Sequence, residues 1–115
     1  MPNGTLAQRT LALEAANRVR QVRAEVRAEV KSLPRNEGCA LVADVIEKPP
    51  REFRSMPVGL LMLWPRQMHS RTVLGMLSAA RVREGRALRE LSPRQCAVLA
   101  EGLRSIEPSK ARVDR

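Results

Sequence analysis

One uninterrupted stretch limits what this chain of 115 residues can fold into. Residues 6–33 contain neither glycine nor proline and are rich in alanine and arginine, which favour the α-helix. Thr5 and Gln8 have the spacing of a capping box, and Pro34 ends the segment. At about 1.5 Å per residue this predicts a helix roughly 40 Å long, which is more than the core of so short a chain requires. We therefore expect part of the helix to project from a compact remainder.

The predicted long helix has two distinct faces. Apolar residues recur at steps of three and four and form a stripe, made of Leu11, Ala15, Val19, Val22, Val26 and Val30. Basic residues recur at the same steps on another face, and they are Arg20, Arg23, Arg27 and Lys31. A basic helix face can lie along nucleic-acid phosphates, whereas the valine stripe could pair with a partner helix.

The rest of the chain is predicted to form short helices. We expect a turn at 34–38, a break at Gly85, and helices over 39–47, 57–64, 71–80 and 93–106. The last helix has the clearest start, with Ser92 as N-cap, Pro93 at its first position and Gln95 in the capping-box position. No segment alternates as strands do.

The fold class is therefore all-α, with a long N-terminal helix and a compact bundle of short helices. The expected organisation is a helical segment at 1–33, a compact domain at 34–108 and a basic tail at 109–115. The methionines at 56, 62, 68 and 76 are assigned to core packing.

The composition points to an anionic partner. The chain has 21 basic and 12 acidic side chains, a net charge of +9, and 18 of the basic residues are arginine. Arginine binds phosphate through a planar fork of donors, so nucleic acid is the first expectation, ahead of an acidic protein or an anionic membrane. The charge is +3 over residues 1–33, zero over 34–60 and +6 over 61–115. Asp44 and Glu47, in the neutral part, are interpreted as solvated charges.

Several function classes find no support in the sequence. Motifs for nucleophilic hydrolysis, nucleotide binding, zinc proteolysis and calcium binding are absent, and His69 with two distant cysteines, Cys39 and Cys96, cannot form a structural zinc site. We expect no catalysis, no metal and no cofactor. Phe53 and Trp64 are the only aromatic residues and are expected in the core, which disfavours binding of single strands by base stacking. Without a membrane span or secretory signal, a cytoplasmic location with reduced thiols is expected.

Three stretches carry a more specific signal, namely LALEAANR at 11–18, LLMLWP at 60–65 and RALRELSPRQ at 86–95. In order and spacing, over about residues 11–106, they resemble the actinobacterial integration host factor family of the single-subunit type. The resemblance implies a long helix joined to a helix–two-turns–helix unit like that of ribosomal protein S13. It implies a protein of the nucleoid that binds double-stranded DNA with little sequence preference and bends it, with a recombinase or other nucleoid proteins as further partners.

The resemblance also implies site residues. Arg86 and Arg89 fall on the arginine cluster with which the family contacts DNA, and Arg83 can compensate for Ala87 at the middle position of that cluster. The family has a glycine-containing turn, which helps backbone amides to hold phosphate, where this chain has the glycine-free turn 65–71.

The predicted DNA-binding set combines the resemblance with the charge pattern. It comprises Arg86, Arg89, Arg83, Arg94, Arg66, Arg71, Arg20, Arg23, Arg27 and Lys31. We expect a monomer, and bridging of two duplexes is left open. Two alternatives stay open as well: an RNA- or ribosome-associated binder, and a regulator that acts through helix-mediated protein interaction.

Overall fold

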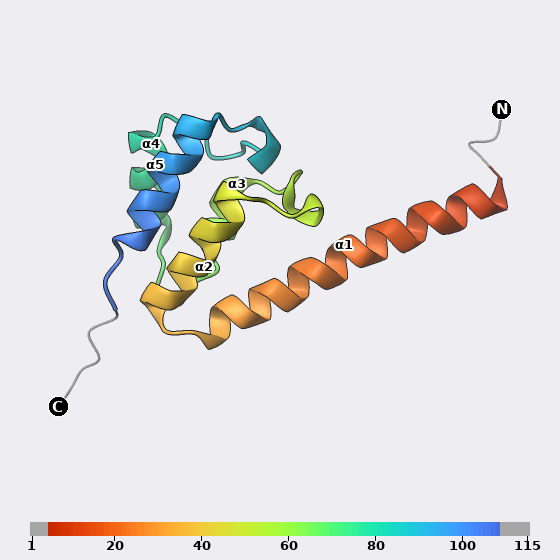
Figure 1. Ribbon diagram of the computed structural model, residues 1–115, viewed down its shortest axis with the longest axis horizontal. Helices are drawn as coiled ribbons and strands as arrows, with labels where there is room; N and C mark the ends of the chain where they lie inside the picture. The colour runs from red at the N-terminus through yellow and green to blue at the C-terminus, as the bar shows by residue number, and fades with distance from the viewer. Residues whose placement is uncertain (1–4, 109–115) are drawn as a thin grey trace.

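The computed structural model describes residues 5–108, which form helices joined by turns (Figure 1). In chain order the elements are α1 (Leu6–Ser32), α2 (Arg35–Glu47), the 3-10 helix η1 (Arg51–Phe53), α3 (Val58–Met62), α4 (Ser70–Ala79), the 3-10 helix η2 (Leu88–Glu90) and α5 (Pro93–Arg104). No strand occurs in this part of the chain, so the all-α prediction is confirmed. The predicted tail at 109–115 lies outside the described residues.

The long helix α1 begins where the sequence predicts. Thr5 Oγ1 accepts a hydrogen bond from the Gln8 amide at 3.2 Å, and Gln8 Oε1 accepts one from the Thr5 amide at 2.9 Å, which completes the capping box. Only the second half of α1 packs on the globule, where Val30 is buried and Val26 is half-buried. The first turns, including Leu11, project into solvent, and the molecule measures 63 Å along its longest axis (Figure 1).

Helix α2 is longer than the sequence suggested. The prediction of a turn at 34–38 before a helix at 39–47 is wrong, because the helix begins at Arg35, directly after Pro34. Pro34 has a φ of −56°, which leads into a helical turn without loss of a hydrogen bond. The misleading signal was Gly38, which lies inside the helix although glycine disfavours that position.

Gly38 is needed because α1 and α2 approach closely after the chain reverses. A Cβ atom at this position would lie 3.0 Å from the Val30 carbonyl oxygen and 3.4 Å from Cβ of Pro65. The carbonyl belongs to the last turns of α1 and cannot move aside without disturbing that helix. A residue without a side chain therefore sets the distance between the two helices.

The core lies between α2 and α5, which make the most extensive contact between elements. Its buried side chains include Cys39, Val42, Ala43, Val45 and Ile46 from α2, and Leu99, Ala100 and Leu103 from α5. Phe53 is buried and packs edge-to-face on half-buried Trp64, with ring centroids 5.9 Å apart, so both aromatic assignments are confirmed. The core assignment of the methionines also holds, with Met56, Met62 and Met68 buried and Met76 half-buried.

The remaining helices start within one residue of their predicted positions. The helix predicted over 57–64 is shorter, Val58–Met62, with Pro57 as its N-cap. The helix predicted over 71–80 begins one residue earlier, at Ser70, and the exposed His69 is its N-cap without a side-chain hydrogen bond. At α5, Ser92 Oγ accepts from the Gln95 amide at 3.1 Å and Pro93 opens the helix, as predicted.

Two glycines are expected to respond in opposite directions to alanine. Gly75 lies on an exposed turn of α4, and a Cβ there would meet nothing within 4 Å. Gly75→Ala should raise the free energy of unfolding by about 0.5–1 kcal/mol through helix propensity. Gly38→Ala should lower it by about 1 kcal/mol or more, because its Cβ would overpack against α1. Denaturant unfolding followed by circular dichroism measures both, and a gain in both variants would contradict the close approach.

Candidate nucleic-acid interface

The segment that follows η1 runs beside η2 and pairs with it. The Leu88 amide donates to the Met56 carbonyl at 3.0 Å, and the Arg89 amide donates to the Arg54 carbonyl at 2.9 Å. Pro57 forms an isolated antiparallel bridge with the residue before η2. These bonds bring Arg54, which the sequence analysis did not select, next to Arg89.

The same segment is fixed to α1 on its other side. Arg23 Nε donates to the Glu52 carbonyl at 2.7 Å, and its Nη2 donates to Ser55 Oγ at 3.0 Å. Arg18 Nε also pairs with Glu52 Oε2 at 3.4 Å. Residues 51–58 thus contact α1 and η2, two segments that lie far apart in the sequence.

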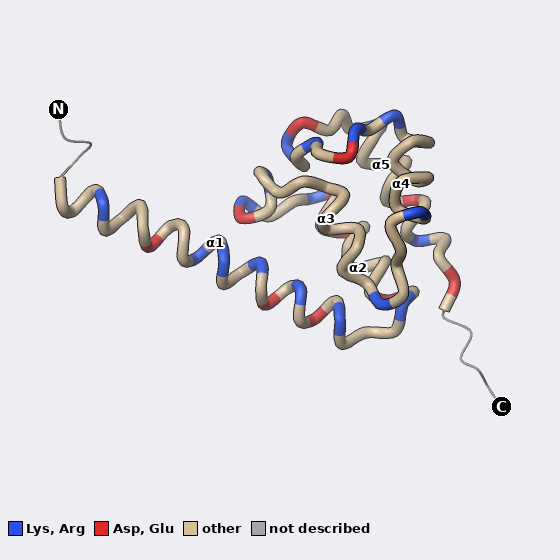
Figure 2. Tube along the Cα trace, turned by 180° about the vertical axis from the view of Figure 1, so that it is seen from behind, with Lys and Arg blue, Asp and Glu red and all other residues tan. Residues whose placement is uncertain are grey.

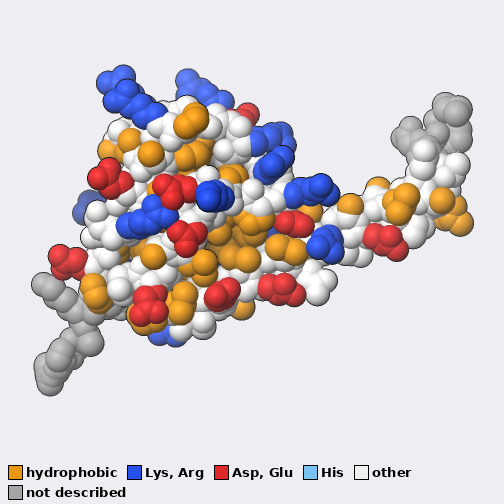
Figure 3. All heavy atoms as spheres, viewed as in Figure 1, with side chains coloured by type: hydrophobic (Ala, Val, Ile, Leu, Met, Phe, Trp, Pro, Cys, Tyr) orange, Lys and Arg blue, Asp and Glu red, His pale blue; other side chains and the backbone are white. Residues whose placement is uncertain are grey.

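The exposed arginines around this junction form what we call the basic edge, comprising Arg20, Arg27, Arg51, Arg54, Arg83, Arg86 and Arg89. In Figure 3 basic side chains lie along the upper rim of the globule and on its side toward α1, whereas the acidic ones lie mostly toward its lower half. Arg86 Nη1 has Glu90 Oε2 at 3.9 Å, and both side chains are about half-exposed. Within residues 5–108 no ion pair engages the other members.

One further arginine on α1 was missed. At about 100° per residue, Arg9 lies within roughly 20° of Arg20 and on the same line as Arg27 around the helix. It is exposed on the projecting part, so this row runs along most of α1, as the basic positions in Figure 2 illustrate. The three acidic residues of the helix fall on its other side, and plotting every charge around the helix could have found this row.

Arg94, the predicted residue at the start of α5, lies beside Arg81. Arg94 is exposed in the first turn of α5 and lines a hollow of about 540 Å³ together with Arg81. Arg81 has a φ of 60°, the left-handed conformation that usually favours glycine. It ends α4 in a Schellman motif, in which the Val82 amide donates to the Leu77 carbonyl at 2.8 Å. No pattern in the sequence indicated that an arginine would stand there.

Two further residues of the predicted set, Lys31 and Arg66, lie near the turn between α1 and α2, away from η2 (Figure 1). Arg66 Nε donates to the Lys31 carbonyl at 2.7 Å, and Lys31 Nζ donates to the Trp64 carbonyl at 3.5 Å. Arg66 therefore stabilises the C-terminal end of α1, where carbonyls lack helical partners. Gln67 takes a φ of 59° in this glycine-free turn, and Arg71 is exposed in the first turn of α4.

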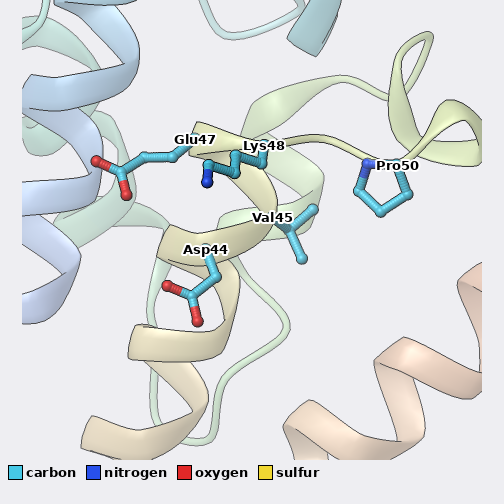
Figure 4. A pocket seen from close by; sticks show the side chains of 5 residues that line it. All are labelled: Asp44, Val45, Glu47, Lys48 and Pro50. Atoms are coloured by element: carbon cyan, nitrogen blue, oxygen red, sulfur yellow. The ribbon is translucent and has the colours of Figure 1, made fainter.

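A cleft at the end of α2 collects acidic groups (Figure 4). It has a volume of about 470 Å³, and Glu47 extends from it toward α5. Arg104 Nη2 donates to Asp44 Oδ1 and to Glu47 Oε1, both at 2.7 Å. The hydrogen bond from Arg104 holds the pKa of Glu47 below its usual value. Asp44 and Glu47 are exposed, in line with the interpretation as solvated charges, but both carboxylates also pair with Arg104 and so join α2 to α5.

Other chemistry is sparse in the part of the chain that the structure describes. Cys39 is buried, Cys96 is half-buried, both thiols are free, and burial raises the pKa of both. No three metal-binding side chains come together within residues 5–108, and no helix there is long and apolar enough to cross a membrane.

Comparison with protein-family models, with curated proteins and with solved structures finds no match to this chain. Function is therefore inferred from the residues and from their places in the fold. Of the predicted set, the fold gathers Arg20, Arg27, Arg83, Arg86 and Arg89 at the basic edge. Arg94 lies at the hollow, Lys31 and Arg66 stabilise the end of α1, and Arg23 is held by internal bonds.

Two neighbouring arginines of α1 should differ in their effect on stability. Arg23→Ala should lower the free energy of unfolding by roughly 1–2 kcal/mol, because it removes two hydrogen bonds that attach α1 to residues 51–55. Arg20→Ala removes the same charge from an exposed position, where its side chain bonds only the neighbouring Asn17 within the described chain, and should cost less than about 0.5 kcal/mol. Chemical unfolding of both variants measures the difference, and equal losses would show that the internal bonds of Arg23 do not matter.

The Arg104 contact should be sensitive to pH. Because the pKa of Glu47 is lowered in the folded state, its contribution is present above the unfolded value of about 4.3 and is lost as the pH falls through the lower folded value. Arg104→Gln should therefore be less stable than the parent chain at pH 7, and the difference should shrink as the pH falls below about 4. Unfolding curves from pH 7 to pH 2.5 test this, with Arg94→Gln as the charge-matched control. A difference that is constant with pH would contradict the pairing.

Proposed function

We propose that this chain binds double-stranded DNA with little sequence preference, as a non-catalytic protein related in character to the single-subunit integration host factors. One observation carries the proposal. Residues 51–58 join the basic row of α1 to the arginines in and just before η2 and so make one surface of exposed arginines from segments that are separate in the sequence. Arginine forks suit phosphate oxygens, and contacts to phosphate carry no base information.

The dimensions of α1 suit this partner. A helix of 27 residues extends about 40 Å at roughly 1.5 Å per residue, slightly more than one helical turn of DNA, which is about 34–36 Å. Its row of arginines can thus follow phosphates while Arg83, Arg86 and Arg89, in and just before η2, engage the neighbouring groove. Contacts to the duplex from both α1 and the η2 region would favour its bending. The resemblance to the integration host factors also implies bending.

Arg81 and Arg94 extend the proposal to the start of α5. A residue with a Cβ atom pays about 1 kcal/mol of conformational free energy for the left-handed backbone found at Arg81, and glycine would not. An arginine kept at a strained position, beside the exposed Arg94, supports a role for its charge in binding. The S13-like helix–two-turns–helix unit, a nucleoid location and a recombinase or other nucleoid protein as partner belong to the same proposal.

The altered turn at 65–71 leads to a different mode of contact. Arg66 is tied to the end of α1, so the exposed Arg71 is the residue from this turn that is free to meet phosphate through its side chain. Backbone amides would contribute less here than in proteins with a glycine at this turn.

The proposal is tested by titrating random-sequence duplex DNA at several salt concentrations. Log K should fall linearly with log salt, because each neutralised phosphate releases counterions. Arg89→Ala, Arg54→Ala and the double variant Arg86→Ala/Arg89→Ala should weaken binding for every sequence tried. Each removed contact should reduce the salt slope by about 0.9.

Lys48→Ala is the matched control, since it removes one positive charge beside the acidic cleft and away from the basic edge. If it weakened binding as much as Arg89→Ala, only net charge would matter and the assigned surface would be wrong. Competition with a matched RNA duplex decides between nucleic acids, and a preference for RNA would contradict the proposal. Proteins recognise an RNA duplex mostly by its shape and need no aromatic side chains to do so, so it is the appropriate competitor.

A further inference from the structure

An apolar groove lies between α3, α4 and the loop before η2. It has a volume of about 230 Å³, and its lining includes Pro57, Leu60, Leu63, Val73, Leu74 and Glu84. Two of these leucines are open to solvent, with Leu60 55% and Leu74 45% exposed. Glu84 is its one charged lining residue, and no ion pair within residues 5–108 engages it. Exposed leucines around an unfilled apolar groove are typical of a surface that binds another chain.

The first turns of α1 present the complementary feature. Leu6 is 79% and Leu13 is 60% exposed, and their spacing of seven residues places them on one face of the helix. Leu11, which is 65% exposed, lies on the other side, in line with the valines that pack on the globule. This end of α1 points away from the globule in Figure 1, so it does not reach the groove of its own chain.

The charges of the two features match. Arg9 lies between Leu6 and Leu13 in the sequence and on the same side of the helix, and it is exposed. An amphipathic helix that seats Leu6 and Leu13 between Leu60 and Leu74 carries this guanidinium to the side of the groove. There it finds Glu84, the only carboxylate in the lining.

We infer that the first turns of α1 dock into the α3–α4 groove of a second copy of this chain. The contact is heterologous, because one surface of each copy meets a different surface of the next. If two copies insert their helices into each other's grooves, the result is a closed dimer. If each copy binds a different neighbour, the result is an open chain of molecules. Either form covers both sets of exposed leucines, and it replaces the expected monomer with a self-associating protein. The inference does not rest on the proposed DNA binding; in the associated form Arg9 pairs with Glu84 of the second copy, and Arg20 and Arg27 of the α1 row remain exposed for phosphate.

Sedimentation of the full chain without nucleic acid, over a range of concentrations, tests the contact. Leu6→Ala/Leu13→Ala changes only the helix, Leu60→Ala/Leu74→Ala changes only the groove, and Leu11→Ala is the control on the opposite helix face. All five positions are exposed, so the fold should persist, and circular dichroism checks it. The parent chain and the control should self-associate, and each double variant should associate at least tenfold more weakly.

A mixture of the two double variants gives the decisive result. The helix variant keeps an intact groove and the groove variant keeps an intact helix, so the mixture should form a heterodimer that neither variant forms alone. Arg9→Glu and Glu84→Arg should each weaken association, and a chain with both changes should recover it. A parent chain that stays monomeric at every concentration overturns the inference. So does association that survives in the groove variant, since this would indicate pairing of α1 with α1.

Discussion

The apolar contact between α2 and α5 is the interaction on which the rest of the molecule depends. Helices as short as α3 and α4 do not persist alone, because isolated helices below about 12–15 residues are marginal in water. They are held by burial of side chains such as Val73 and Leu77 against the centre that α2 and α5 build. Gly38 then fixes α1 to α2, so the direction in which α1 projects follows from the same core.

The distribution of ion pairs determines where the positive charge is available. Arg104 takes up two carboxylates at the α2–α5 contact, and Arg18 takes up Glu52 beside η1. Three carboxylates near the packed helices are thereby paired with arginines of the same chain. Among the described residues, Glu90 beside Arg86 is the one carboxylate within ion-pair distance of the basic edge, so exposed positive charge is concentrated there.

The sequence predicted the features that depend on local chemistry. The caps at Thr5 and Ser92 are set by residues within one turn, so their positions are confirmed in the structure. The interior glycine of α2 was misread, because its cause is a backbone carbonyl of another helix. The sequence could not predict that Arg23 is hydrogen-bonded while Arg20 is exposed, because both recur at helical spacing. Only the placement of residues 51–55 beside α1 distinguishes them. The role of this segment depends on a backbone ladder to η2 that no periodicity signals.

Two residues with left-handed backbone, Gln67 and Arg81, illustrate how strain and neighbouring bonds interact. Each costs about 1 kcal/mol relative to glycine, and each lies where the surroundings determine the turn. The carbonyl of Arg81 accepts from Gln95 Nε2 at 3.1 Å, so the residue that closes the capping box of α5 also holds the end of α4. The turn is thus stabilised through backbone and Gln95, and nothing in it requires a charged side chain at position 81. What an arginine adds there, beyond what a glycine would give, is a positive charge at the C-terminal end of α4 and beside Arg94, which the proposed DNA binding would use.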